Sequence, residues 1–384
     1  MNVEPFALAL AGPLGTARGE LTEREGFVVR LSVGGTTGIG EATPLPGWTE
    51  PLAECEAALS RTADAVTDGA DPSTLLGSGD AASSSTGDSG VLGADPLAGA
   101  PAARHAVASA VTDARARAAD EPLSRRLSRE TSADPPAAAP PIVESVPVNA
   151  TVGDGAPVET AEAVAAAVER GFETVKLKVG ARPVPADIER VAAVRERSPD
   201  VTLRADANGA WAPDEATRAL EALAEYDVAY VEQPLPADST GEDGTRRDMR
   251  AHAALRGRGV GIALDESLTV GANPVAAALD ADAADVLVLK PMALGGPDRA
   301  LAAAHAARAA GVEPVVTTTI DGALARATAV HVAAAIREVP ACGLATADRL
   351  ERDLLDADPA PVTDGRVAVP DGPGVAGTIR WHGT

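Results

Sequence analysis

A regular alternation of short β-prone runs and alanine-rich helical stretches begins near Val146 and continues to about Ala345. This alternation is typical of parallel strands joined by crossover helices. The region spans 200 residues, the lower end for a (β/α)₈-type barrel. An open doubly wound sheet is the alternative, disfavoured because no Gly-x-Gly-x-x-Gly follows any predicted strand. The predicted strands are Val146–Val152, Thr174–Val179, Val201–Ala205, Val228–Glu232, Gly261–Leu264, Val286–Lys290, Glu313–Thr318 and Cys342–Ala345.

The sequence before this region is less regular. Phe27–Val33 predicts a strand, and Leu52–Val66 has the periodicity of a helix. Gly38–Trp48 is rich in glycine and proline and predicts a loop. Residues 67–100 are rich in Gly, Ser, Asp and Ala, which is typical of a flexible insertion without chemistry. Asp134–Pro141 predicts a stiff, proline-rich linker.

The composition excludes several classes of protein. A formal charge of −23 argues against nucleic acid or an anionic membrane as a partner. Aromatic residues are only 2% of the chain, so Ala, Val and Leu must build the core. Cys55 and Cys342 are too few for a disulfide framework. Because no basic leader or membrane-length apolar run is present, we expect a cytoplasmic protein, and its acidity indicates a halophilic, high-salt cytoplasm.

Only three of the 33 basic side chains are lysines, and their placement is informative. Lys176 and Lys178 lie in the run Glu173–Val179, and Lys290 ends the run Asp285–Lys290. Codon bias would explain the scarcity of lysine, but it would not explain three lysines inside β-prone runs. A desolvated lysine can lose its proton and act as a base, whereas arginine cannot. We therefore expect these positions to need an amine.

Charged residues end five consecutive predicted strands. Lys176 and Lys178 are two residues apart on the second strand, so both point to the same face. The strands that follow end in Asp206, Glu232, Asp265 and Lys290. One acidic residue at such a place usually caps a helix, but in a barrel all these strand ends meet at the catalytic face. The three carboxylates can converge on one divalent cation, with Mg²⁺ as the first prediction and Mn²⁺ as the alternative.

This order of charges suits one kind of chemistry. The cation would bind a substrate carboxylate while a neutral Lys178 removes the proton from the adjacent carbon. The cation and Lys290, from the opposite side, would stabilise the resulting ene-diolate. The ammonium of Lys176 would favour the neutral form of Lys178. A non-catalytic barrel that only binds a cation is an alternative, but it gives no reason to retain the lysines.

These motifs together resemble the enolase superfamily, in its muconate-cycloisomerase-like subgroup. The motifs are Lys-x-Lys, Asp-x-Asn, Glu-Gln-Pro, Asp-Glu-Ser and a later lysine. The resemblance implies an α/β fold with three parts. Residues 1–135 would form an N-terminal α+β capping domain, and residues 146–345 a modified (β/α)₇β TIM-like barrel. Residues 346–384 would return to the capping domain.

The resemblance also implies roles for single residues. Lys178 would be the acid/base on one face of the substrate and Lys290 the group on the other, with Lys176 tuning Lys178. Leu14–Gly26 would be a mobile loop over the site. The metal ligands would be Asp206, Glu232 and Asp265. The residues that contact the substrate would be Asn208, Thr319 and Asp321.

Within the superfamily, the segment Gly40–Trp48 resembles the o-succinylbenzoate synthase family through its Gly-Glu-Ala-Thr-Pro-Leu-Pro-Gly sequence. This likeness implies a dehydratase of menaquinone biosynthesis that acts on a small-molecule carboxylate. An N-acylamino acid racemase, a dipeptide epimerase or a cycloisomerase is the alternative, because the same two lysines serve those reactions. Asp321 stands where relatives often have Glu or Ser. The sequence allows a homo-oligomer but does not predict one.

Overall fold

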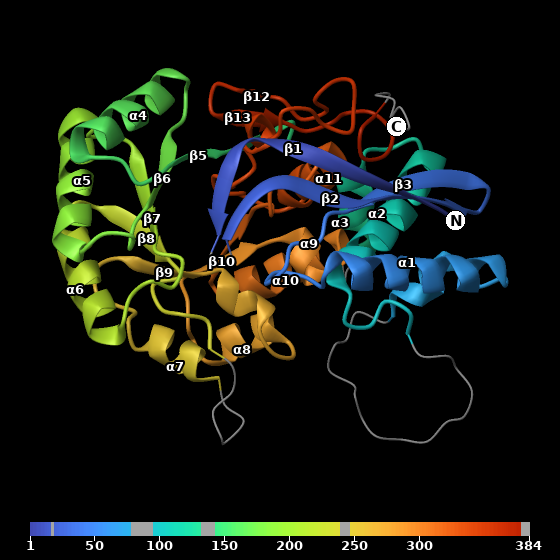
Figure 1. Cartoon of the computed structure of the whole chain (residues 1–384), viewed down its shortest axis with the longest axis horizontal. Helices are drawn as coiled ribbons and strands as arrows, with labels where there is room; N and C mark the ends of the chain where they lie inside the picture. The colour runs from blue at the N-terminus through green and yellow to red at the C-terminus, as the bar shows by residue number, and fades with distance from the viewer. Residues whose placement is uncertain (17–18, 78–94, 132–142, 239–245, 378–384) are drawn as a thin grey trace.

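The computed structural model describes residues 1–16, 19–77, 95–131, 143–238 and 246–377. Half of the predicted insertion at 67–100 and the whole predicted linker Asp134–Pro141 therefore lie outside the described residues, whereas 67–77 and 95–100 are described. Figure 1 shows the parallel strands and helices α4–α6 on one side of the molecule, and the N-terminal sheet with α1 and α2 on the other.

The N-terminal part is an antiparallel sheet of three strands in the order β1-β2-β3. Its strands are β1 (Asn2–Thr16), β2 (Gly19–Val33) and β3 (Thr36–Ala42). Two expected loops were wrong in part. Leu14–Gly26 is mostly strand, with residues 17–18 outside the described part, and the first five residues of Gly38–Trp48 belong to β3. The glycines of β3 suggested a turn, but in the fold they serve close packing.

Helix α2 lies directly on β3 because two glycines of that strand have no side chain. A Cβ on Gly40 would overlap the Ala106 carbonyl oxygen, and one on Gly38 would overlap that of Ala110. The contact surface of α2 is made of small residues, including Ala106 and Ala110, which are completely buried. The helices of this part are α1 (Leu52–Thr67), the 3₁₀-helix η1 (Pro72–Leu76), α2 (Pro101–Ala118) and α3 (Leu123–Thr131).

Gly40→Ala is expected to destabilise the fold by about 1–3 kcal/mol, because α2 must move away from the sheet to admit one methyl group. Thermal unfolding measures the change. Gly12→Ala on β1 is the matched control, since no atom lies within 4 Å of a Cβ built there. Equal melting temperatures for the two variants would show that the close approach of α2 to β3 does not limit stability.

The second part is a curled sheet of seven parallel strands in the order β11-β10-β9-β8-β7-β6-β5. Every strand lies beside its neighbours in sequence, as the predicted alternation requires. Helices pack outside the sheet, and Val, Leu and Ala dominate the core between them. The strands are β5 (Asn149–Val152), β6 (Thr174–Lys178), β7 (Thr202–Asp206), β8 (Val228–Glu232), β9 (Gly261–Leu264), β10 (Val286–Leu289) and β11 (Glu313–Val316).

Helices connect the successive strands of the sheet, and most of these helices have a proline in their first turn. Proline suits this position because the amides of the first turn have no partner inside the helix. The connecting helices are α4 (Pro157–Glu169), α5 (Val184–Arg197), α6 (Pro213–Ala224), α7 (Arg247–Ala253), η2 (Glu266–Thr269), α8 (Pro274–Asp280), α9 (Pro291–Leu294), α10 (Pro297–Ala309) and α11 (Ala323–Ala334).

Two residues complete the ring of strands. Cys342 forms a parallel bridge with Val148 beside β5, and Gly343 forms one with Thr317 beside β11. Cys342 N–H donates to Pro147 O (2.8 Å), and Gly343 N–H donates to Val316 O (2.9 Å). We call Cys342 and Gly343 the seam. The predicted eighth strand, Cys342–Ala345, is thus reduced to two residues, and the fold is a closed (β/α)₇β barrel.

The C-terminal segment contacts both parts. Strands β12 (Val362–Thr363) and β13 (Arg366–Ala368) form a small antiparallel sheet with β4 (Ser145–Pro147), at the start of the barrel. The predicted first strand, Val146–Val152, is therefore divided between β4 and β5. Near the N-terminal sheet, Glu351 N–H donates to Ala9 O (3.0 Å). The short helix η3 (Ala347–Arg349) precedes this contact.

Candidate active site

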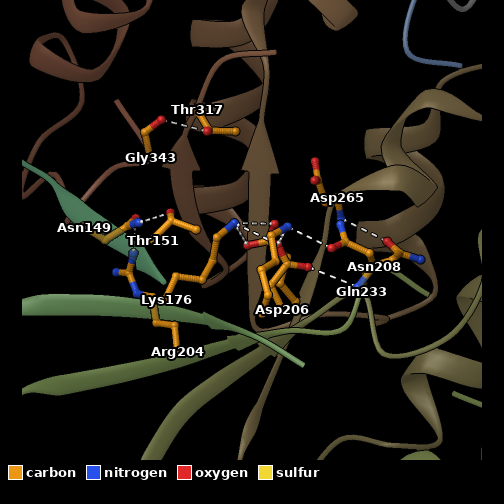
Figure 2. A network of polar contacts seen from close by, with 12 residues as sticks. Asn149, Thr151, Lys176, Arg204, Asp206, Asn208, Gln233, Asp265, Thr317 and Gly343 are labelled. Carbon is orange, nitrogen blue, oxygen red and sulfur yellow. Dashed lines mark hydrogen bonds and ion pairs between the residues drawn. The ribbon is translucent and has the colours of Figure 1, made fainter. Parts of the chain in front are cut away.

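The carboxyl ends of β6, β7 and β8 bring two lysines and two carboxylates together. Lys178 lies beside Asp206 in the strand register, and Asp206 lies beside Glu232. The Lys176 ammonium donates to both oxygens of Glu232 (2.8 and 2.9 Å) and lies 3.1 Å from Asp206 Oδ2. Figure 2 shows Lys176 pointing toward Asp206 at this edge of the sheet.

Lys178 is the most accessible of the three lysines, with a side chain 38% exposed. Its ammonium donates to Asp206 Oδ2 (2.6 Å) and to Asn208 Oδ1 (2.8 Å). Asn208 in turn donates to Glu266 Oε1 (3.0 Å), and its backbone adopts a left-handed φ of 46°. The position of Lys178 thus combines contact with the carboxylates and access from outside.

Lys290 approaches from the other side of the barrel, at the end of β10. Its ammonium donates to both oxygens of Asp265 (2.6 and 2.5 Å). Lys290 as a whole is buried, with only 8% of its surface exposed. The ammonium also lies 3.3 Å from the centre of the Trp48 ring, in a cation–π contact. Trp48 belongs to the loop after β3, so the N-terminal part of the chain covers this lysine.

Gln233 fixes the backbone at the end of β9. Its amide oxygen accepts from the N–H groups of Asp265 (3.1 Å) and Ser267 (3.2 Å). Its amide nitrogen donates to Ser267 Oγ and to Leu235 O, each at 2.8 Å. Gln233 is completely buried and has a positive φ of 42°. It therefore holds Asp265 in place without contacting its carboxylate.

Below these charges, the inside of the barrel contains a further buried cation. Arg204 lies beside Lys176 in the register and donates to Ala341 O (2.6 Å), next to the seam. Its guanidinium lies 4.9 Å from the centre of the Tyr230 ring. Figure 2 shows Arg204 near Asn149 and Lys176, away from Asp265. Arg204 thus braces the closure of the barrel.

Burial and mutual repulsion shift the pKa values of the carboxyl groups. Burial, followed by the charges of Asp206 and Asp265, raises the pKa of Glu232 to about 7. Burial also raises the pKa of Asp265 to about 6, although Lys290 opposes the change. Burial would raise the pKa of Asp206, but Lys176 and Lys178 hold it below its usual range. Burial would lower the pKa of Lys176, but Asp206 and Glu232 raise it well above 10.5.

The three carboxylates form a donor set that suits a hard divalent cation. Each supplies only oxygen, and Asp206, Glu232 and Asp265 are at most 4% exposed. A bound dication would relieve the repulsion that acts on Glu232. In the described part of the chain, these side chains are not already gathered around one point. Each accepts hydrogen bonds from a lysine instead, so their use as ligands requires those bonds to open.

The other predicted substrate residues lie in the turn after β11. The Thr319 hydroxyl and N–H both donate to the carboxylate of Asp321, the latter at 3.3 Å. Both residues are buried, at 5% and 3% exposure. Between them, Ile320 has a left-handed φ of 60°, which is rare and strained for a β-branched residue. The side chain of Asp321 thus stabilises its own turn, and the predicted substrate contacts stay a prediction.

Glu41 of β3 lies against the same turn and is completely buried. Burial, followed by repulsion from Asp321, raises the pKa of Glu41 from 4.5 to about 7. The folded protein therefore binds a proton that the unfolded chain releases between about pH 4.5 and 7. The resulting stabilisation is complete below pH 4.5 and is lost as the pH rises through 7.

Glu41→Gln is expected to flatten the loss of stability between pH 5 and pH 8, since glutamine has no proton to release. Each unit of pKa shift corresponds to about 1.4 kcal/mol, so the two proteins should differ measurably in how steeply their stability falls with pH. Thermal unfolding across this pH range tests the expectation. Glu25→Gln, at an exposed position of β2, controls for the loss of a negative charge. If the stability of Glu41→Gln and of the original protein fell with pH in parallel, the expected role of Glu41 would be contradicted.

The sequence profile of the enolase C-terminal domain-like family matches residues 159–382, which is more than half of the chain. The chain belongs to the enolase superfamily. The profile match covers most of the barrel, including all three lysines and the three acidic strand ends. The predicted fold, a (β/α)₇β barrel with an N-terminal capping domain, is confirmed for this superfamily member, and we call the N-terminal part the capping domain below.

Curated relatives of this superfamily member include o-succinylbenzoate synthases. The chain is 38% identical to that of Thermobifida fusca over 226 residues, which are 58% of this chain and 66% of the relative. It is 40% identical to that of Mycobacterium tuberculosis over 238 residues, which are 60% of this chain and 67% of the relative. The matched region thus spans about two thirds of the length of these relatives.

Solved structures with the same fold include two epimerases. The L-Ala-D/L-Glu epimerase from Bacillus subtilis is 25% identical, with a TM-score of 0.79 over 99% of this chain and 98% of that chain. A dipeptide epimerase from Enterococcus faecalis, complexed with Mg and a dipeptide, is also 25% identical, with a TM-score of 0.80 over the same shares. Both branches of the predicted chemistry are therefore represented among the relatives of this superfamily member.

Sequence reasoning named the charged residues but missed several that hold them. Trp48 is the last residue of the proline-rich segment Gly40–Trp48, but its position in the sequence gave no indication of a contact with Lys290. Gln233 was part of a motif, but its role depends on the bend after β9. Arg24 and Glu41 lie on capping strands, where an isolated charged residue is normally solvated. Their contacts with the barrel appear only in the fold.

Proposed function

We propose that the protein is an o-succinylbenzoate synthase. It would dehydrate 2-succinyl-6-hydroxy-2,4-cyclohexadiene-1-carboxylate to the aromatic product. The observation that carries this proposal is that Lys178 on β6 and Lys290 after β10 flank the strand ends that carry the three buried carboxylates. The likeness to curated synthases at 38% and 40% identity supports the choice of a dehydratase over other reactions of this site.

Lys178 is the base in this proposal, because it combines access with contact to the carboxylates. Its neutral amine takes the proton from the carbon next to the substrate carboxylate. That proton leaves with the ring hydroxyl as water, and the ring becomes aromatic. Asp206 would be available as a ligand only when its bond from the Lys178 ammonium opens. Lys290 keeps its positive charge and stabilises the negative charge that develops on the substrate.

Asp206, Glu232 and Asp265 would hold a divalent cation, with Mg²⁺ as the first choice and Mn²⁺ as the alternative. When bound, the cation supplies positive charge for the substrate carboxylate. The oxygen-only donor set and the repulsion at Glu232 support this assignment. Asn208, Thr319 and Asp321 are proposed to contact the substrate, the last two at the end remote from the carboxylate.

An epimerase or racemase is the second candidate, and the likeness to dipeptide epimerases favours it. One assay separates the two. The purified protein with Mg²⁺ is given the cyclohexadiene substrate in one arm and a panel of dipeptides and N-acylamino acids in deuterated water in the other. We expect the aromatic product to form in the first arm. Deuterium incorporation with inversion in the second arm, without dehydration in the first, would reject the synthase.

We further propose that the enzyme is a halophilic cytoplasmic protein whose partners are its small-molecule substrate and, at most, further copies of itself. None of the helices in the described ranges is long and apolar enough to cross a bilayer. The charge of −23 and the rarity of lysine support a high-salt environment, because screening by salt weakens the repulsion among acidic groups. The same charge disfavours nucleic acid as a partner.

The melting temperature is expected to rise with KCl concentration between about 0.1 and 3 M, since salt shortens the range of charge repulsion to about 3 Å at 1 M. Thermal unfolding across the series measures the effect. A series with sucrose at matched water activity controls for general stabilisation by solutes. A melting temperature that is flat or falls with KCl would reject the halophilic proposal and leave the catalytic one intact.

A further inference from the structure

The turn Thr317–Gly322 cannot keep its conformation from its own sequence. Ile320 is β-branched and has a left-handed φ of 60°, a conformation in which its side chain crowds the backbone. Such strain persists only where the surroundings impose it. Asp321 bonds within the turn, and the hydroxyls of Thr317 and Thr318 bond to Gly343 O (2.9 Å) and to the Thr346 hydroxyl (3.2 Å). The bonds to Ile320 and Gly322, at the strained part of the turn, come from the capping domain.

Arg24 of β2 is the first of these supports. Its Nε–H donates to Ile320 O (3.1 Å), the carbonyl of the strained residue itself. The same guanidinium donates to Thr43 O (2.8 Å) and Pro44 O (3.2 Å), in the loop that leads to Trp48. Arg24 is only 2% exposed. One buried cation thus ties the capping strand, the loop bearing Trp48 and the turn after β11 together.

Glu41 of β3 is the second support. Its carboxylate accepts from the N–H groups of Gly322 (2.7 Å) and Ala325 (2.9 Å), at the start of α11. Gly322 has no side chain that could cap this helix, and a Cβ there would lie 2.9 Å from the Glu41 carboxylate. Glu41 therefore caps these two amides from the capping domain, while Asp353 of the C-terminal segment accepts from the Ala323 N–H (2.6 Å) between them. Glu41 fixes where the turn ends, while Arg24 fixes its centre.

We propose that Arg24 and Glu41 are positioning residues for the end of the site that binds the part of the substrate remote from the metal-binding carboxylates. They hold the turn that carries Thr319 and Asp321, and Arg24 also holds the loop that sets Trp48 over Lys290. Neither residue has to touch the substrate. This inference rests on the proposed function, because it assumes that the turn contacts the substrate.

Arg24→Lys is the first test, because it keeps the buried charge but removes the fork that reaches three carbonyls. We expect KM to rise about tenfold with kcat changed less than about threefold, since the proton transfer lies at Lys178 and the turn affects binding. A variant that melts earlier but keeps its KM would overturn the proposal, because Arg24 would then only stabilise the fold.

Rescue by Ile320→Gly makes the test specific. Glycine adopts a positive φ without support, so the turn should no longer need Arg24. Adding Arg24→Lys to Ile320→Gly is therefore expected to change KM by less than about twofold. If Arg24→Lys raises KM by the same factor in both backgrounds, its effect does not pass through the turn and the proposal is wrong.

Hydrogen exchange tests the cap without any assay of activity. Glu41→Gln should speed the exchange of the Gly322 and Ala325 amides, whereas Glu25→Gln should leave both unchanged. Unchanged exchange in Glu41→Gln would overturn its part of the proposal. A protein that dehydrates no cyclohexadiene substrate but shows the faster exchange would refute the proposed function alone. An active enzyme with an unchanged KM in Arg24→Lys would refute the inference alone.

Discussion

Lys178→Arg is expected to lower turnover by about 10²–10⁴-fold, the range typical for the loss of a general base. Arginine keeps the positive charge and can still bond to Asp206, but it does not supply a neutral amine at working pH. Because Lys178 is partly exposed, the substitution should leave the fold and the binding of Mg²⁺ largely intact. Steady-state kinetics, thermal unfolding and calorimetric titration with Mg²⁺ measure the three properties.

Lys290→Arg is the matched comparison, because it makes the same change on the opposite face. If Lys290 only stabilises negative charge, as in a dehydratase, a fixed cation there should retain some activity. If Lys290 must exchange a proton, as in a racemase that uses two bases, Arg should be as damaging as at position 178. Full activity of Lys178→Arg would refute the mechanism for either substrate.

Glu232→Gln is expected to weaken Mg²⁺ binding by more than the 10–100-fold that is typical for a residue outside the ligand shell. It removes one of three anionic ligands and the acceptor of two bonds from Lys176. Without added cation, the variant should be no less stable than the original, because it also removes a buried charge that Asp206 and Asp265 repel. Calorimetric titration and thermal unfolding without and with Mg²⁺ separate these effects.

Glu173→Gln is the control for this variant. Glu173 is exposed and precedes β6, at the opposite end of the barrel strands, so it should leave Mg²⁺ binding unchanged. Equal Mg²⁺ affinity for Glu232→Gln and the original protein would remove Glu232 from the ligand set. A metal-bound structure in which Asp206 or Asp265 lies outside coordination distance would do the same for those residues.

The charged centre was predictable because it depends on strand order alone. Once the alternation of strands and helices is recognised, Lys178, Asp206 and Glu232 must meet at one edge of the sheet. The capping domain was harder to predict. The glycine-rich sequence of β3 resembles that of a turn, and only the packing of α2 against the strand shows why the glycines are needed. Arg24 and Glu41 were unpredictable because their partners lie almost 300 residues away in the chain.

The seam has a consequence for how the barrel is assembled. Each of the seven strands pairs with neighbours that are close in sequence, so these pairings can form without closing the ring. The ring of strands closes only when Cys342 and Gly343 pair beside β5 and β11, the first and last strands of the sheet. Until they arrive, two strands present unpaired backbone groups, which readily pair with another chain. Refolding should therefore be most prone to unwanted association before closure, so dilution at this stage should raise the yield of active protein.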